Sequence, residues 1–198
     1  MKFEAYKKQT EQWPDDGKHI MAQFDEETII VYQAYSDAIA DFAVAHQYFG
    51  GAFSYTRMSW IKPKKILWMM FRSGWAQKSG QERVLAIRIK RSFFDEVLTQ
   101  AIPSSFIASG FATQEAWKQA IETSDVRLQW DPDHDPVGNC TPRRALQLGF
   151  RGEMLTRYGK EEILEIIDVT PFVLEQFPHA DQHEQLLIPS ESIYQSCI

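Results

Sequence analysis

The spacing of hydrophobic residues changes along the chain, and the changes predict both strands and helices. Residues 28–34 contain a run of β-branched and aromatic residues, a pattern typical of a buried strand. Residues 84–90 alternate in polarity, which predicts a strand with one apolar face. Between these segments, apolar residues recur at helical spacing over residues 36–49, and the Gly50-Gly51 pair predicts the end of that helix.

Further elements of both kinds are expected along the rest of the chain. We expect strands over 53–57, 66–72, 126–130, 161–169 and 186–188, and helices over 92–101, 113–123, 141–150 and 170–177. The elements follow no regular βαβ order, so the sequence predicts an α+β fold with a largely antiparallel mixed sheet and flanking helices. We expect one such domain over residues 27–198, preceded by an irregular polar arm over residues 1–26.

Composition and charge restrict the class of protein. The chain has 198 residues, of which 44% are hydrophobic, enough for one packed domain. Its net charge of −6 argues against a protein that coats nucleic acid over its whole surface. No apolar run reaches the roughly 18 residues of a membrane span. Two cysteines cannot build a disulfide scaffold, so we expect a cytoplasmic protein without a membrane partner.

The segment from Arg57 to Arg91 departs from this acidic average. It contains ten basic residues and one acid, a net charge of +9, so the rest of the chain carries −15. Trp60 and Trp75 lie in the same segment, and indole rings can stack on bases while cations neutralise phosphates. The pattern indicates a local site for a nucleotide or nucleic acid. A buried hairpin with tryptophans in the core and solvated lysines remains an alternative.

The candidate phosphate-binding and base-binding residues come from this segment, from the end of the first long strand and from a second basic cluster. They are Tyr32, Gln33, Arg57, Trp60, Lys62, Arg72, Trp75, Lys78, Arg143, Arg144 and Gln147.

An acidic loop follows the strand at 126–130 and carries the densest group of potential metal ligands. Asp131, Asp133 and His134 could hold a divalent ion such as Mg²⁺ or Mn²⁺, although their spacing is not that of a zinc site. The alternatives are an Asp-Pro turn and carboxylates that fix Arg143 and Arg144. The common motifs of nucleotide hydrolases, dinucleotide-binding folds, zincins and serine hydrolases are absent.

Several strings together resemble a bacterial and fungal family catalogued as domain of unknown function 4291. The strings are YQAY at 32–35, TRMSWIKP at 56–63, LWMMFRSGWAQKSGQERVLAI at 67–87, WDPDHDP at 130–136 and RRALQLGFRGE at 143–153. The resemblance covers roughly residues 28–194 and implies a cytosolic single-domain protein, but no established activity.

The string at 184–189 is similar to the Glu-x-Leu/Val-Leu-x-Pro ending of many ADP-ribosyltransferases. In those enzymes the acid engages the nicotinamide ribose of NAD, so the similarity implies that role for Glu184. It also implies that Tyr32 or Arg57 contacts the adenylate half of NAD, that Trp75 stacks on nicotinamide, and that the fold is ADP-ribosyltransferase-like. The second acid that usually precedes the string by two residues is absent.

These features favour an enzyme that acts on a nucleotide or nucleic acid, and within that class a transferase that uses NAD. The acid that stabilises the reacting centre would be Glu184, Glu191 or Asp131. A metal-dependent phosphodiester hydrolase with Asp131, Asp133 and His134 as its centre is an alternative. A non-catalytic module that binds nucleotides or single-stranded nucleic acid is another.

Overall fold

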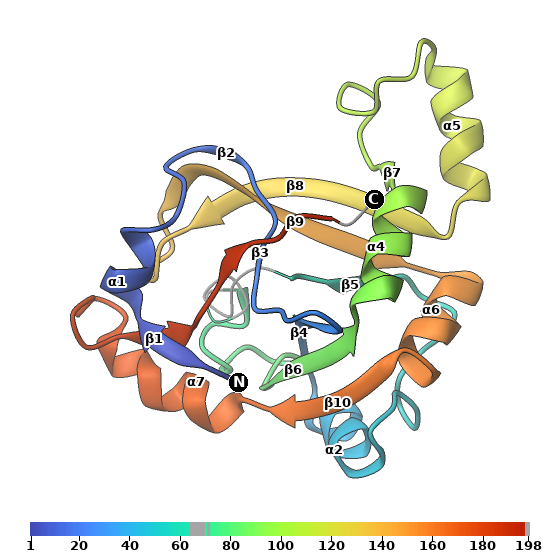
Figure 1. The fold of residues 1–198 in the computed structure, drawn as a ribbon. Coiled ribbons are helices and arrows are strands. Elements are labelled where there is room, and N and C mark those ends of the chain that lie inside the picture. Colours follow the sequence, from blue (N-terminus) through green and yellow to red (C-terminus); the bar gives the residue numbers. More distant parts are fainter. Residues whose placement is uncertain (64–69, 71, 197–198) are drawn as a thin grey trace.

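The computed structural model describes residues 1–63, 70 and 72–196, and its largest elements are two sheets on opposite sides of the core (Figure 1). In the first sheet, β4 (Thr28–Tyr35) and β6 (Arg83–Lys90) pair antiparallel along their whole length. Strand β10 (Ile163–Asp168) pairs antiparallel with the other edge of β6. The predicted α+β fold with mostly antiparallel strands is confirmed.

The second sheet is built on a long antiparallel hairpin of β8 (Val126–His134) and β9 (Cys140–Phe150). The short strands β5 (Ser59–Ile61) and β2 (Gly17–Lys18) both pair with β9, the first antiparallel and the second parallel. Strand β7 (Ile102–Pro103) pairs parallel with the start of β8. The hairpin therefore has neighbours on both sides.

The two sheets meet at Lys62, the residue directly after β5. Its carbonyl oxygen accepts a hydrogen bond from the backbone N–H of Tyr32 at 2.9 Å, and its own N–H donates to Tyr32 at 3.3 Å. One short segment thus pairs with β9 of the second sheet and with β4 of the first. This junction fixes the position of the pocket described below.

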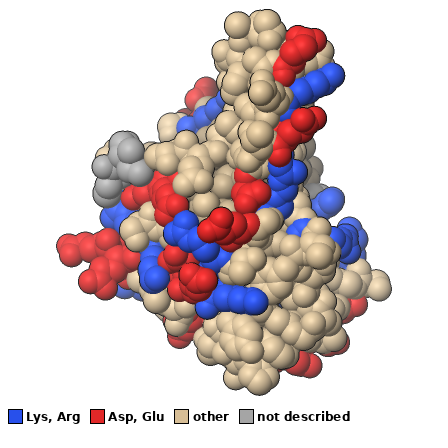
Figure 2. Space-filling model, turned by 90° about the vertical axis from the view of Figure 1, so that its right-hand side faces the viewer, with Lys and Arg blue, Asp and Glu red and all other residues tan. Residues whose placement is uncertain are grey.

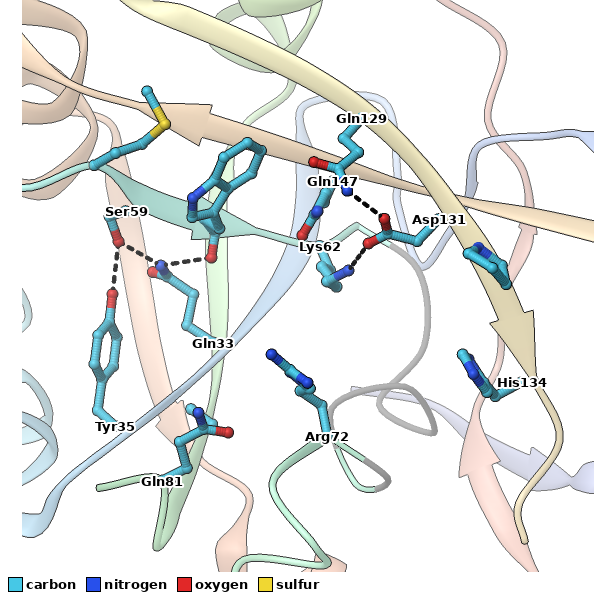
Figure 3. Close-up of a pocket in the computed structure, with 14 residues that line it drawn as sticks. Gln33, Tyr35, Ser59, Lys62, Arg72, Gln81, Gln129, Asp131, His134 and Gln147 are labelled. Carbon is cyan, nitrogen blue, oxygen red and sulfur yellow. Dashed lines mark hydrogen bonds and ion pairs between the residues drawn. The ribbon is translucent and has the colours of Figure 1, made fainter. Parts of the chain in front are cut away.

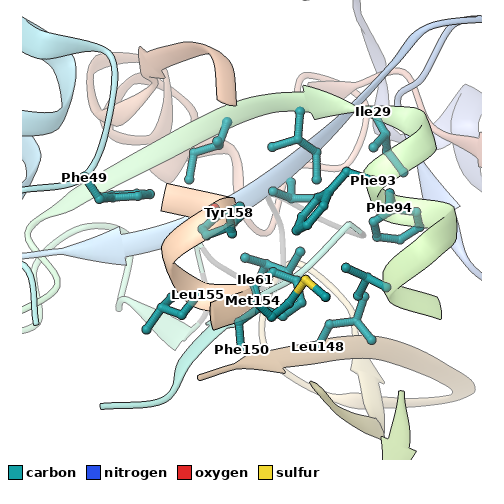
Figure 4. Packing of buried hydrophobic residues seen from close by; sticks show 14 of the residues in the cluster. Ile29, Phe49, Ile61, Phe93, Phe94, Leu148, Phe150, Met154, Leu155 and Tyr158 are labelled. Carbon is teal, nitrogen blue, oxygen red and sulfur yellow. The ribbon is translucent and has the colours of Figure 1, made fainter. Parts of the chain in front are cut away.

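The sheet of β4 and β6 is covered on both faces. On one face, Ile29 and Val31 join a core cluster with the second sheet and three helices, where aromatic rings such as Phe93 and Tyr158 pack together (Figure 4). On the other face, Ile30 belongs to a second cluster formed with the N-terminal segment and residues 169–188. This double burial explains the unbroken apolar run from Ile29 to Tyr32 in β4, because a strand covered on both faces buries the residues of both faces.

The remaining elements surround the sheets. They are β1 (Phe3–Ala5), α1 (Tyr6–Thr10), β3 (Met21–Ala22), α2 (Asp37–His46), α4 (Arg91–Gln100), α5 (Gln114–Thr123), α6 (Gly152–Lys160), α7 (Thr170–Gln176), a 3₁₀ turn (Phe177–His179), β11 (Leu187–Pro189) and β12 (Ser192–Ile193). Helix α5 projects from the body of the molecule (Figure 1), and the hydroxyl of Thr113 accepts a hydrogen bond from its first turn. Within the described residues, no helix has the length and apolar character needed to cross a membrane.

The predicted helix over 141–150 is wrong, because this segment is strand β9. The Thr141-Pro142 pair imitates a helix start, but both residues lie within the strand. The buried residues Leu146, Leu148 and Phe150 recur at every second position, which is the period of a strand. Pairing with β8 and β5 therefore outweighs the local helix signal.

Two other predictions fail nearby, and one cannot be compared. The predicted loop at 131–139 is strand β8 as far as His134, followed by a turn in which the carboxylate of Asp135 accepts backbone N–H groups of Val137 and Asn139. The strand predicted at 53–57 is absent, and β5 begins two residues later. The strand predicted at 66–72 falls mostly outside the described residues.

The N-terminal segment is not the irregular arm that its polarity predicts. Strand β1 pairs with β11, and β3 pairs with β12, so both halves of the segment are tied to the end of the chain. The side chains of Tyr6 and Trp13 are buried in the second core cluster. The segment therefore contributes to the core.

Candidate functional site

A pocket of about 640 Å³ opens at the junction of the two sheets (Figure 3). Strands β4, β8 and β9 and the segment around β5 contribute its walls, and Arg72 and Gln81 contribute from the chain that leads into β6. Seven residues selected from the sequence line it together: Gln33, Trp60, Lys62, Arg72, Asp131, His134 and Gln147.

An ion pair between Lys62 and Asp131 lies in the wall of the pocket, where the two sheets meet. The ammonium nitrogen Nζ lies 2.9 Å from the carboxylate oxygen Oδ2, and the Lys62 side chain is only 3% exposed. Lys62 is held there by its backbone pairing with β4, whereas Asp131 projects from β8. The fold thus places a buried cation and a carboxylate face to face.

The environment of Lys62 changes its protonation. Burial of the ammonium group lowers the pKa of Lys62 from 10.5 to about 8, and the neighbouring Asp131 carboxylate opposes this shift. The positive charge of Arg72 lowers the pKa further. Lys62 and Arg72 therefore bring two positive charges to the region beside Asp131, and such an arrangement favours an incoming anion.

The second oxygen of Asp131 also has a partner. The side-chain amide of Gln129 donates a hydrogen bond to Oδ1 at 2.7 Å, and the hydroxyl of Ser104 donates to the amide oxygen of Gln129 at 3.3 Å. Asp131 is therefore fixed at both oxygens, by a cation and by an amide.

The opposite wall is a network of polar side chains around Gln33. Its amide nitrogen donates to Ser59 Oγ at 2.8 Å and to the carbonyl of Trp60 at 3.0 Å, and its oxygen accepts from Tyr158 at 2.7 Å. Ser59 also shares a hydrogen bond with the hydroxyl of Tyr35, whose pKa is raised by burial. The amide of Gln33 is thus occupied on both sides, and it positions β5 rather than contacting a ligand.

The indole of Trp60 has its place in the pocket because residue 149 is glycine. A Cβ atom at Gly149 would lie 3.0 Å from the Trp60 ring and 2.8 Å from the sulfur of Met58. Trp60 and Gly149 are direct partners in the β5–β9 ladder. The missing side chain therefore lets the half-buried ring lie against the sheet, where it forms an aromatic surface of the pocket.

Arg72 and His134 complete the polar lining. The side chain of Arg72 points toward the space in front of Lys62 (Figure 3), and the residue is exposed to solvent. His134 lies at the end of β8, and its Nε2 is 3.5 Å from the sulfur of Cys140 across the hairpin. The pocket thus presents two cations, one carboxylate, an imidazole and an indole.

Four other predicted phosphate-binding cations do not line this pocket, and one of them, Arg143, is buried. Arg57 and Lys78 are exposed outside it. Arg144 lines a different cavity on the other face of the hairpin. The cations selected from the sequence are therefore divided among several surfaces.

Tyr32 and Trp75 belong to the core and do not line the pocket. Tyr32 is fully buried, and Trp75 is 7% exposed in the same cluster, with its ring 5.4 Å from that of Phe177. The alternative of core tryptophans thus holds for Trp75, whereas Trp60 reaches the pocket. Stacking of Trp75 on nicotinamide has no support from this arrangement.

Asp133 and Arg143 form a buried pair beneath the N-terminal segment. The guanidinium Nε donates to Oδ2 of the fully buried Asp133 at 3.0 Å, and the group lies 5.2 Å from the ring centre of Trp13. This matches the alternative in which loop carboxylates fix an arginine. Among the described residues, no three His, Cys, Asp or Glu side chains are grouped to hold a metal ion.

The two glutamates proposed as catalytic acids lie elsewhere. Glu184 is exposed and forms an ion pair with Lys7. Glu191 is buried, and its backbone N–H donates to Gln9. Of the three acids named from the sequence, Asp131 alone lines the pocket.

The sequence did not point to Ser59 or Gln129 as site residues. A usable signal existed for Gln129, because it lies two residues before Asp131 and therefore on the same face of a strand. It was missed because the strand was expected to end at residue 130.

Several described cations of the basic segment are paired with acids. Arg83 pairs with Asp168, and Arg88 pairs with Glu165. On the face shown in Figure 2, basic and acidic side chains are interspersed. Part of the excess charge of the segment is therefore neutralised by acids from distant parts of the chain, and among its described cations Lys62 and Arg72 line the pocket.

Fold and site together define an α+β protein with a recessed, cation-bearing pocket between two sheets. The model of the family described as Domain of unknown function (DUF4291) matches residues 19–194, so the chain belongs to this family. No curated protein matches the sequence. The family assigned from the sequence strings is confirmed, and similarity to ADP-ribosyltransferases is not shown.

Proposed function

We propose that the pocket binds a nucleotide and transfers a group from it, with NAD as the donor. The observation that carries this proposal is the placement of Lys62 and Arg72 around Asp131, in a recessed pocket beside the indole of Trp60. A volume of about 640 Å³ lies in the range of sites that hold small ligands and cofactors.

The two cations account for phosphate binding. Charged hydrogen bonds to phosphate oxygens are stronger than neutral ones, and a guanidinium can form two of them side by side. The ammonium of Lys62 is already desolvated, so a phosphate that reaches it is not competing with a full hydration shell. An anion held here would also relieve the repulsion between Lys62 and Arg72.

Trp60 and the amides account for binding of a base or nicotinamide ring. A half-buried indole offers a surface on which any aromatic base can stack. Gln147 lies directly across the β8–β9 ladder from Gln129, so two amides lie on the same face of the hairpin. Amide groups can donate to and accept from the polar edge of a base.

Asp131 is the acid available for chemistry at the ribose. When the bond from C1′ to nicotinamide breaks, its electron pair leaves with neutral nicotinamide and C1′ becomes oxocarbenium-like. A fixed carboxylate stabilises this positive charge. The acceptor then forms its bond to C1′ and releases its proton to solvent, which completes the transfer.

Calorimetry with NAD and ADP-ribose in the presence of EDTA tests the binding step. Arg72→Ala should weaken binding by about 1.5–3 kcal/mol, the contribution of a hydrogen bond to a charged group. Arg144→Ala is the matched control, because it removes an exposed arginine outside the pocket and should leave affinity unchanged. Absence of NAD and ADP-ribose binding to the wild-type protein would refute the proposal.

Nicotinamide release, measured by chromatography, tests the chemical step. Asp131→Asn should retain ADP-ribose binding and lose most of the release. Release without NAD-dependent transfer to an acceptor would indicate hydrolysis of NAD. Nucleotide binding with no release would indicate the non-catalytic module, and Mn²⁺-dependent cleavage of a phosphodiester that Asp131→Asn abolishes would indicate the hydrolase.

A further inference from the structure

A second cavity, of about 390 Å³, lies against the β8–β9 hairpin on the face opposite the first pocket. Its lining includes Lys18 of β2, Trp130 of β8, Arg144 of β9 and the hydroxyl-bearing Ser104 after β7. Trp130 and Asp131 are consecutive in a strand, so their side chains point to opposite faces of the sheet. The two cavities therefore flank the same stretch of β8.

The two cations of this cavity are neighbours across a strand pair. Lys18 is the register partner of Arg144 in the parallel β2–β9 ladder, and both residues are exposed. Neither side chain forms an ion pair within the described part of the chain, in contrast with Arg83 and Arg88. Adjacent cations without a counterion are the arrangement that a phosphate neutralises.

The second cavity repeats the chemical pattern of the first. Each combines two cations with one half-buried tryptophan, Trp60 in the first and Trp130 in the second. A cation pair and an aromatic ring together match the phosphate and the base of one nucleotide. A recurrence of this pattern on both sides of one strand indicates a ligand with more than one nucleotide.

Gln129 forms the boundary between the two cavities and lines both of them. Its amide connects Ser104 on one side with Asp131 on the other. Strand β7 pairs with β8 only at Arg127 and Leu128, and in the part of the chain that the structure describes no other strand covers that edge beyond Leu128. An extended ligand that reaches both cavities would therefore cross the edge of β8 beside the contact between Ser104 and Gln129.

We propose that Lys18, Arg144 and Trp130 bind single-stranded nucleic acid, which crosses the edge of β8 and is the acceptor for the group transferred in the first pocket. The acceptor role rests on the proposed function of that pocket. The strand must be unpaired, because a base can lie on Trp130 only when it is free of its complementary base. Phosphate contacts to Lys18 and Arg144 carry no base preference, so binding depends on the backbone and on stacking.

Fluorescence anisotropy with a labelled twelve-nucleotide single-stranded RNA, at several salt concentrations, tests this inference. Arg144→Ala and Lys18→Ala should each weaken binding about five- to tenfold and reduce the slope of log affinity against log salt by about 0.7. Lys118→Ala, on the projecting helix α5, removes an exposed cation that lines neither cavity and should change neither quantity. The matching duplex should bind more weakly than the single strand.

Calorimetry with NAD on the same proteins separates the two proposals. If NAD binds normally to Arg144→Ala while RNA affinity falls, both proposals are supported. If NAD binds the wild-type protein but RNA does not, or if RNA binds wild type and Arg144→Ala equally, the second cavity is not a nucleic-acid site. If RNA binding depends on Arg144 but NAD does not bind, the binding site stands and the acceptor role fails together with the proposed function.

Discussion

Lys62 and Asp131 lie 69 residues apart in the chain and form an ion pair of 2.9 Å where the two sheets meet. The backbone of Lys62 pairs with β4, and its side chain reaches a carboxylate of β8. The pair therefore has two consequences: it ties the sheets together, and it places a desolvated cation beside an acid in the pocket.

Removing Asp131 alone should lower the free energy of unfolding more than removing Asp131 and Lys62 together. Asp131→Ala leaves a buried ammonium group without its carboxylate, and we expect the free energy of unfolding to fall by about 3 kcal/mol. Lys62→Met should cost less, because methionine fills similar space without charge. Urea denaturation of both single variants and the double variant measures the coupling. Strictly additive losses would show that the ion pair contributes nothing.

Nucleotide affinity should fall at alkaline pH. The pKa of Lys62 is lowered to about 8, chiefly by burial, so the ammonium is charged below pH 8 and loses its charge above it. Affinity for ADP-ribose should therefore be constant from pH 6 to 7 and decrease by up to tenfold per pH unit above 8. Calorimetry across this range measures the effect. Lys62→Arg, which stays charged, should show a flat profile, and a decrease of equal size in that variant would exclude Lys62 as its source.

The contribution of Lys62 to the free energy of unfolding should rise with pH, whereas nucleotide affinity should fall. In the unfolded chain Lys62 keeps its proton up to its ordinary pKa of 10.5, whereas the folded protein releases it near pH 8. The unfolded state thus binds more protons between these values, and the contribution of Lys62 to the free energy of unfolding rises with pH across that window. Comparison of wild type with Lys62→Met by urea denaturation at pH 7.5 and 10 isolates this contribution. An identical pH dependence in the two proteins would contradict it.

Gly149→Ala should disturb the aromatic wall of the pocket. The added methyl group would lie 3.0 Å from the Trp60 ring and 2.8 Å from the Met58 sulfur, so these side chains would have to shift to admit it. We expect a loss of about 1–3 kcal/mol of stability, as for other overpacked sites, and weaker nucleotide binding. Adding Met58→Ala should recover part of the stability, because it frees space beside the new methyl group. Failure of this rescue would point to a cause other than the clash.

Substitution of Arg143 should lower stability but not nucleotide affinity, and substitution of Arg72 should have the reverse effect. Arg143→Met leaves the fully buried Asp133 without its guanidinium, so unfolding free energy should fall by about 3–5 kcal/mol with nucleotide affinity retained in the folded protein. Arg72→Ala should retain stability and lose affinity, since Arg72 is exposed at the pocket. Thermal unfolding and calorimetry on both variants provide the comparison. Loss of affinity in folded Arg143→Met would contradict its structural role.

Local pattern determined much of the fold. The run of β-branched and aromatic residues in β4 and the alternation of β6 predicted the two central strands, because burial on a sheet requires apolar residues at fixed spacing. The Thr113 cap and the Thr170-Pro171 start predicted α5 and α7. Local pattern failed at β9, where a proline near the start suggested a helix and distant pairing partners made a strand.

The sequence by itself determined the family, the α+β class and the kinds of group present at the site: cations, a tryptophan and an acid. Only the tertiary structure decided which of them meet. Trp60 and Trp75 come from one segment, yet one lines the pocket and the other packs in the core. Asp131 and Asp133 are two residues apart, yet one faces Lys62 and the other is buried against Arg143. A charged or aromatic side chain acquires its role from the neighbours that folding brings to it, and those neighbours come from distant positions that local spacing cannot specify.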